Sequence, residues 1–158
     1  MKWAIVPLAL LGACTPLRPQ VSLEPGVSLK SYRRFVVEPV SDATGAAFNL
    51  SVTDSLRRQL ADRLRSHGLT VAATPGDIAG PALVITSTLE VFKGIPFTLQ
   101  LGGPGVTTCA LRSVLRDRDT GRRLGEILAQ DLEEGIRPIS VLNECARDVG
   151  DAIHRLVR

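Results

Sequence analysis

The residues of this chain that can undergo the largest range of reactions are its three cysteines, Cys14, Cys109 and Cys145. A thiol can be acylated, oxidised to a disulfide or bound to a metal, and its surroundings decide which of these occurs. Cys14 follows an apolar run, residues 3–11, that begins after a single lysine and ends in Gly12 and Ala13. A positive start followed by such a run is typical of an export signal, and the run is too short to span a bilayer. The sequence therefore predicts a signal peptide over residues 1–13.

The four residues Leu11-Gly12-Ala13-Cys14 resemble the lipobox of bacterial lipoproteins. The resemblance implies that the chain is cut before Cys14, whose thiol and new amine then carry acyl chains such as palmitate. Three chains would anchor the protein firmly, because one alone holds only weakly. Thr15 stands where an aspartate would favour the inner membrane, so the resemblance favours the outer membrane of a Gram-negative bacterium, on its periplasmic side. The alternatives are a cleaved signal beside a coincidental cysteine and an uncleaved apolar N-terminus.

The composition fits one globular domain. The chain has 158 residues, of which 44% are hydrophobic and 22% charged, and these values are ordinary for a protein with a single core. Its net charge of +3 is small, and its arginines are not clustered with aromatic residues, so we expect no nucleic acid partner. The domain organisation predicted is a signal over 1–13, a lipidated tether over 14–30 and one periplasm-facing domain over 31–158.

Two amphipathic helices are predicted from apolar residues that recur every three or four positions. In the first, over residues 50–67, Leu56, Leu60 and Leu64 share one face, and Gly68 follows where a left-handed helix cap needs a glycine. The second, over residues 140–158, buries a stripe that includes Cys145, and its Gly150 allows close packing.

Alternating apolar residues predict strands over residues 33–40, 69–72, 82–93, 107–116 and 122–132. Within the third of these strands the predicted core face carries Leu83, Ile85, Leu89 and Val91. The last two strands form a hairpin. Because both helices are amphipathic, the economical packing places them on one face of one sheet. The predicted fold class is therefore α+β, a two-layer sandwich of one mostly antiparallel sheet with two helices on one face.

Cys109 and Cys145 form a candidate disulfide. Cys109 shares its strand face with Leu111 and Leu115, and Cys145 lies in the apolar stripe of the last helix. Both thiols should therefore point into the same interface, in a protein exported to an oxidising compartment. A bond between them would close a loop of roughly 35 residues and contribute on the order of 3 kcal/mol. The alternative is a pair of buried free thiols that do not meet.

No set of residues in the sequence predicts catalysis, a metal site or a cofactor. The Asp117-x-Asp119-x-Gly121 segment resembles the start of a calcium loop, but apolar residues stand where its glutamate should fall, and a hairpin turn explains it. His67 ends the first helix, where a positive charge suits the helix dipole, and His154 is expected to be solvated. We therefore predict that the protein is not an enzyme.

The segment from residue 94 to 108 is a candidate contact loop. It is rich in glycine and carries Phe97, Leu99 and Leu101, and apolar loops of this kind often form contact surfaces. The alternative is an insertion that folds back over the edge of the sheet.

Four segments in this order resemble small outer-membrane lipoproteins of proteobacteria: Tyr32–Val40, the helix that ends in Gly68-Leu69-Thr70-Val71, Ala82–Ile85 and the strand that leads into Asp117–Gly121. The fold of those lipoproteins is similar to the N-terminal region of the curli-secretion lipoprotein. The resemblance implies a non-enzymatic binding or scaffolding module of the cell envelope, with the membrane and an envelope protein as partners. The alternative is an accessory lipoprotein subunit of an envelope transport or export system.

Overall fold

The computed structural model describes residues 18–45, 51–72, 74–94, 106–134 and 138–158. In chain order its elements are β1 (Gln20–Leu23), β2 (Arg34–Val37), β3 (Ser41–Asp42), α1 (Ser51–Ser66), β4 (Thr70–Ala72), a single 3-10 turn (Pro75–Asp77), β5 (Leu83–Gly94), β6 (Val106–Asp117), β7 (Arg123–Glu134) and α2 (Pro138–Val157). The predicted α+β class with one mostly antiparallel sheet is confirmed.

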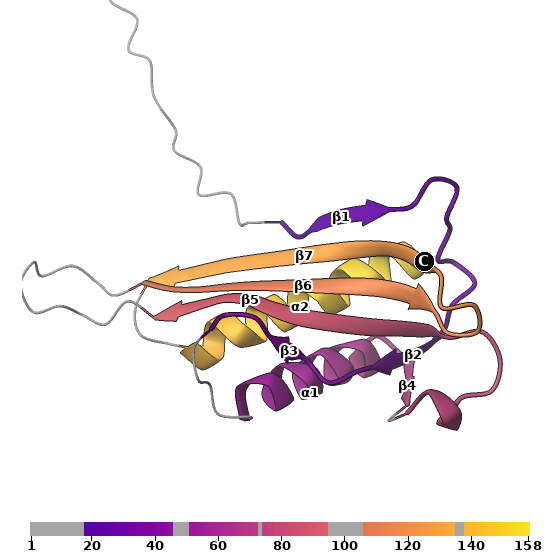
Figure 1. Ribbon diagram of the computed structural model, residues 1–158, viewed down its shortest axis with the longest axis horizontal. Coiled ribbons are helices and arrows are strands. Elements are labelled where there is room, and N and C mark those ends of the chain that lie inside the picture. The colour runs from indigo at the N-terminus through magenta and orange to yellow at the C-terminus, as the bar shows by residue number, and fades with distance from the viewer. Residues whose placement is uncertain (1–17, 46–50, 73, 95–105, 135–137) are drawn as a thin grey trace, which may run out of the picture.

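The sheet is built around three long antiparallel strands. Its order is β1-β7-β6-β5-β2-β4, and β3 pairs with β5 beyond the end of β2 (Figure 1). The short strands β2 and β3 run parallel to β5, and β4 runs parallel to β2. The turn between β6 and β7 is closed by hydrogen bonds from the backbone and hydroxyl of Thr120 to the Asp117 carboxylate, as the hairpin prediction requires.

A β-bulge in β5 changes one predicted face. The register with β6 shifts between Leu89 and Val91, so that Phe92 pairs with Cys109. One extra residue in a strand reverses the alternation beyond it. Phe92 therefore packs against the core, and the prediction that Val91 belongs to the core face is wrong.

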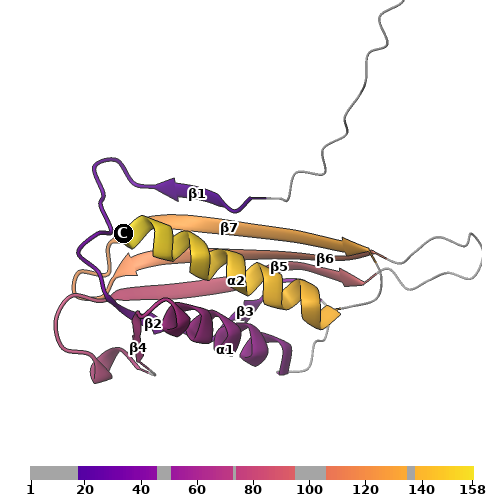
Figure 2. The same cartoon turned by 180° about the vertical axis from the view of Figure 1, so that it is seen from behind.

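Both helices lie on the same side of the sheet, where α2 crosses β6 and β7 and α1 lies beside α2 (Figure 2). Their apolar stripes bury Leu56, Leu60 and Leu64 from α1 and Val149 and Ile153 from α2 against the sheet core. Phe35, Ile85, Leu111 and Ile127 are completely buried on the facing strands. In the part of the chain described, neither helix has the length and apolar character needed to cross a membrane.

Part of the segment predicted as a tether joins the sheet. β1 pairs antiparallel with β7, with Val21 opposite Ile127 and Leu23 opposite Gly125. Gly125 makes this pairing possible, since a Cβ on it would lie 2.5 Å from the Ser22 carbonyl oxygen. β1 is therefore an edge strand of the sheet, beside β7 (Figure 1).

Candidate binding grooves on both sides of the second helix

A polar groove of about 420 Å³ runs between the two helices. It is lined by Gln59, Asp62, Arg63 and Ser66 from α1 and by Ser140, Asn143, Glu144 and Arg147 from α2. Every one of these side chains can donate or accept a hydrogen bond. The groove therefore arises from the flanks of two amphipathic helices whose apolar stripes are turned toward the sheet.

The helices approach closely beside this groove because α2 carries Gly150 there. A Cβ on Gly150 would lie 2.7 Å from Cγ of Arg63, which is too close for an ordinary contact. The absence of a side chain lets Arg63 lie across α2 and reach the next residue, Asp151. The close packing predicted at Gly150 is confirmed.

A helix cap fixes the position of His67 at the end of α1, beside the groove between the helices. Gly68 has a φ of 75°, Leu69 donates to the Leu64 carbonyl at 3.2 Å, and Gly68 donates to the Arg65 carbonyl at 2.9 Å. These two bonds form a Schellman motif, which ends a helix with a glycine in the left-handed region. The predicted cap is therefore confirmed, and it holds His67 at the last turn of α1.

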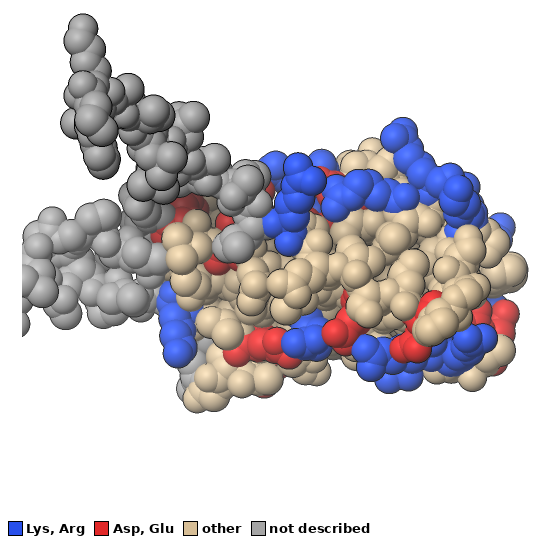
Figure 3. Space-filling view, turned by 90° about the horizontal axis from the view of Figure 1, so that it is seen from above, with Lys and Arg blue, Asp and Glu red and all other residues tan. Residues whose placement is uncertain are grey.

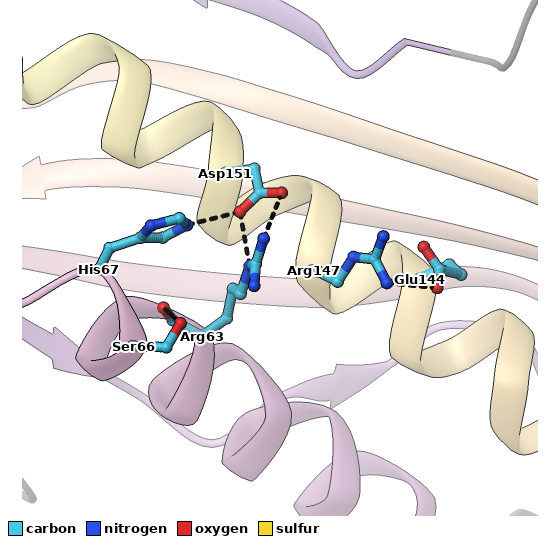
Figure 4. Close-up of polar contacts among 6 residues, drawn as sticks. All are labelled: Arg63, Ser66, His67, Glu144, Arg147 and Asp151. Carbon is cyan, nitrogen blue, oxygen red and sulfur yellow. Dashed lines mark hydrogen bonds and ion pairs between the residues drawn. The ribbon is translucent and has the colours of Figure 1, made fainter.

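Asp151 is the centre of a clamp between the helices (Figure 4). Arg63 donates from Nε to Oδ1 at 2.6 Å and from Nη2 to Oδ2 at 2.9 Å, and Nε2 of His67 lies 2.6 Å from Oδ1. The bidentate hydrogen bond from Arg63 lowers the pKa of Asp151 from 3.8 to about 2, with a further contribution from His67, although burial acts in the opposite direction. The Asp151 carboxylate is therefore ionised at any physiological pH.

His154 extends the clamp by stacking on His67. The two imidazole centroids are 4.0 Å apart, and the rings are within 7° of parallel. Nδ1 of His154 is buried and has no hydrogen-bond partner among the described residues. Desolvation and the nearby His67 and Arg158 lower the pKa of His154, which favours the neutral ring. The expectation that His154 is simply solvated is therefore wrong.

A second groove of about 610 Å³ lies on the other side of α2, against β1. It is lined by Arg18, Pro19, Val21, Asp131, Glu144, Arg147, Asp148 and Arg155, so Glu144 and Arg147 belong to both grooves. These two are joined by a salt bridge of 2.9 Å. Figure 3 looks onto this edge and shows basic side chains along the margin over α2. Burial and the neighbouring Asp131 raise the pKa of Asp148.

The side chains of these grooves are suited to polar binding. Ser66 donates its hydroxyl proton to the Arg63 carbonyl at 2.7 Å, and the Asp151 carboxylate contacts three nitrogens, two of Arg63 and one of His67. Neither side chain is arranged as a nucleophile beside a general base. Within the described ranges, no three His, Cys, Asp or Glu side chains are grouped so as to hold a metal ion. The arginines, amides and hydroxyls at the rims suit a polar or charged surface of a partner.

The structure places the two predicted disulfide cysteines together but as free thiols. Cys109 and Cys145 are both buried in the interface between sheet and α2. The thiol of Cys145 interacts with that of Cys109, and this hydrogen bond, together with burial, raises the pKa of Cys145. The shared interface is as predicted, and the bond itself stays a prediction. Cys14 and the loop residues Phe97, Leu99 and Leu101 lie outside the described residues.

The sequence did not predict the clamp. Its signals are the spacing of Arg63 and His67, four residues apart on α1, and that of Asp151 and His154, three residues apart on α2. Each pair lies on one helix face beside the apolar stripe. Neither spacing indicates that the two faces meet, and that information comes only from the tertiary packing.

The sequence matches no family model and no curated protein. Solved structures are similar in fold. A variant PelC dodecamer from Paraburkholderia phytofirmans has a TM-score of 0.63 and 16% identity, over 86% of this chain and 97% of that one. The lipoprotein GNA1162 from Neisseria meningitidis has a TM-score of 0.54 and 17% identity, over 77% and 98%. A DUF330 protein from Xanthomonas campestris has a TM-score of 0.50 and 14% identity, over 90% of each chain. The chain thus has a fold found in bacterial lipoproteins, and the likeness to the curli-secretion lipoprotein stays a prediction.

Proposed function

We propose that the protein is a lipid-anchored lipoprotein of the outer membrane that faces the periplasm and acts as a non-enzymatic binding or scaffolding module. The observation that carries the proposal is the fold, which GNA1162, a lipoprotein, shares over nearly its whole length. The Leu11-Gly12-Ala13-Cys14 segment supplies the matching anchor signal on this chain. A two-layer sandwich of this kind leaves the outer flanks of its helices available to a partner, and the interhelical groove is the polar contact site there.

The anchor is tested by metabolic labelling with a radioactive fatty acid and by membrane fractionation. The wild-type chain should incorporate label and sediment with outer membranes, whereas Cys14→Ala should do neither. Label on the Cys14→Ala variant, or a wild-type chain that carries none, contradicts the anchor.

The contact site is tested by crosslinking in intact envelopes. Arg147 lines both grooves, so Arg147→Glu should remove the partner captured by the wild type. Arg58→Glu is the matched control, because it makes the same charge change at an exposed position outside these grooves. Equal capture by both variants means that the grooves are not the contact site.

The second candidate is an accessory subunit of an envelope transport or export system. The observation that favours it is the similarity to PelC, whose solved form is a dodecamer. The lipidated protein is extracted in mild detergent, and its mass is measured by native mass spectrometry. It should then form an oligomer with a defined number of identical subunits. A protein that stays monomeric at all concentrations contradicts this candidate and leaves the first one standing.

A further inference from the structure

Among the described residues, three large apolar side chains are exposed, and two of them lie at one end of the domain. Leu132, near the end of β7, is 52% exposed, and Ile139, in the first turn of α2, is 71% exposed. β7 ends and α2 begins at the same end of the molecule (Figures 1 and 2). We call this end the apolar end and define it by Leu132 from the sheet and Ile139 from the helix.

A lysine lies beside Leu132 on the face of the sheet that points away from the helices. The register pairs Leu132 with Thr108, and Thr108 with Lys93, across three neighbouring strands. Lys93 is exposed and has no carboxylate within 4.0 Å in the described part of the chain. Asp131 and Glu133 project to the opposite face, because side chains alternate along a strand. At the apolar end this face therefore combines an apolar side chain with a cation.

The register of β1 shows in which direction the N-terminal segment leaves the domain. Gln20 pairs with Leu128, and β1 runs antiparallel to β7. Arg18 therefore lies about 7 Å from Gln20 in the direction of Leu132, which is itself about 14 Å along the strand from Leu128. Leu132 is thus only about 7 Å further along the sheet than Arg18.

The chain between Cys14 and Arg18 is short enough to select the end of the domain that meets the membrane. Its four residue steps span at most about 14 Å, which carries Cys14 past Leu132. Arg123, the first residue of β7, lies about 24 Å from Arg18 in the opposite direction, beyond the reach of the tether. Acyl chains on Cys14 can therefore hold a bilayer against the apolar end and not against the end where β7 begins.

We propose that the apolar end contacts the bilayer that holds the acyl chains of Cys14, with Leu132 and Ile139 inserted at the boundary between headgroups and acyl chains. The inference rests on the lipid anchor of the proposed function. Insertion removes both side chains from water, and the long stem of Lys93 lets its ammonium group reach the headgroup phosphates. The anchor keeps the apolar end at a high local concentration beside the membrane, so a small apolar area is enough to orient the domain.

The test uses the full lipidated protein, reconstituted into vesicles of phosphatidylethanolamine and phosphatidylglycerol with no other protein present. A fluorophore is attached to Gln130→Cys or to Ser31→Cys, which are both exposed positions. Gln130 is two residues from Leu132 and shares its face of β7. Ser31 precedes Tyr32, whose hydroxyl donates to Asp117 at the opposite end of the long strands. A quencher on the lipid headgroups reports how close each fluorophore lies to the membrane.

Quenching should be stronger at Gln130→Cys than at Ser31→Cys. Cys109 and Cys145 are buried, so the introduced thiol is the one that reacts in the folded protein. The difference should persist in high salt, because salt screens charge attraction and leaves apolar insertion intact. Equal quenching at the two positions, or a difference that high salt abolishes, overturns the proposal.

Two double variants at the same positions make the test specific. Leu132→Asn combined with Ile139→Asn should reduce quenching at Gln130→Cys to the level at Ser31→Cys, because polar amides do not insert. Leu132→Met combined with Ile139→Met is the matched control, since it keeps both side chains apolar and should keep the difference. Thermal melts establish that both double variants are folded. A polar variant that keeps the difference, or an apolar variant that loses it, contradicts insertion of these two side chains.

Vesicle flotation separates this inference from the proposed anchor. A protein that fails to float with the vesicles has no lipid anchor, which overturns the anchor and the inference with it. A protein that floats but is quenched equally at the two labelled positions keeps its anchor and overturns the inference alone, and it leaves Leu132 and Ile139 to a protein partner.

Discussion

Asp151 is the residue on which the contact between the helices depends most. Its carboxylate joins Arg63 and His67 of α1 to α2, and its side chain is only 26% exposed. We expect Asp151→Asn to lower the free energy of unfolding at pH 7 by about 1–2 kcal/mol, because the amide leaves Arg63 without a counter-ion. The loss is measured by urea unfolding of the two proteins under identical conditions.

The pH dependence of this difference provides a control. The lowered pKa of Asp151 means that its contribution is present above pH 3.8 and disappears as the pH falls through about 2. The wild type and Asp151→Asn should therefore converge in acid. Asp62→Asn removes an exposed salt bridge with Arg65 and should cost less than about 0.5 kcal/mol. A similar loss of unfolding free energy in both variants would show that the clamp stabilises the fold no more than an exposed salt bridge does.

The paired thiols of Cys109 and Cys145 lead to a prediction about oxidation. Because both are buried in one interface and interact, we expect protein purified from an oxidising compartment to carry the bond between them. Formation of the bond removes two hydrogens, which pass to the oxidant of the compartment. Mass spectrometry of the unfolded, alkylated protein detects this change, and the bond should raise the free energy of unfolding by about 3 kcal/mol. Alkylation of both thiols without prior reduction would contradict the prediction, and Cys145→Ala gives the unbonded reference.

At the scale of elements, the attachment of β1 depends on one glycine. A methyl group on Gly125 would lie 2.5 Å from the Ser22 carbonyl oxygen and 2.7 Å from Cδ2 of Leu23. We expect Gly125→Ala to displace β1 from β7 at a cost of about 1–3 kcal/mol. Hydrogen exchange of the β1 amides should then become fast while that of β6 is unchanged. Gly76→Ala is the control, because its nearest contact would be an ordinary 3.9 Å to Thr74; equally fast exchange of β1 in this control would point to a general loss of stability.

The elements that could be predicted from the sequence are those with a long periodic pattern. Both helices and the three long strands follow from apolar residues at regular spacing, and Gly68 marks the end of α1 because its left-handed conformation is required there. β3 was missed because it has only two residues, both exposed. β1 was assigned to the tether although Val21 and Leu23 alternate with polar residues, because the strand is short and its side chains are mostly exposed. The sequence gives no signal for the bulge at Glu90 either, because Val91 and Phe92 are both apolar and either could lie on the core face.

At the scale of the whole molecule, the candidate site could not be predicted because it belongs to no single segment. The Arg63–Asp151 and Tyr32–Asp117 contacts join residues more than 80 positions apart. In the sequence, such charged residues are expected to be ordinary surface groups. Only the fold shows which of them lie side by side. The anchor is the reverse case, since Leu11-Gly12-Ala13-Cys14 is a local signal that needs no tertiary structure.

The Tyr32–Asp117 contact ties the N-terminal connection to the central hairpin, and it should set the alkaline limit of stability. Burial and the hydrogen bond to Asp117 raise the pKa of Tyr32 from 10.0 to about 12. Since the folded state favours the protonated phenol, its contribution is complete below pH 10 and is lost as the pH rises through about 12. Tyr32→Phe should cost about 0.5–1.5 kcal/mol at neutral pH, and its free energy of unfolding should fall less steeply in alkali. Urea unfolding of both proteins from neutral to alkaline pH measures the two slopes. Parallel slopes would show that the phenol is not held by Asp117, and that other contacts join the N-terminal connection to the hairpin.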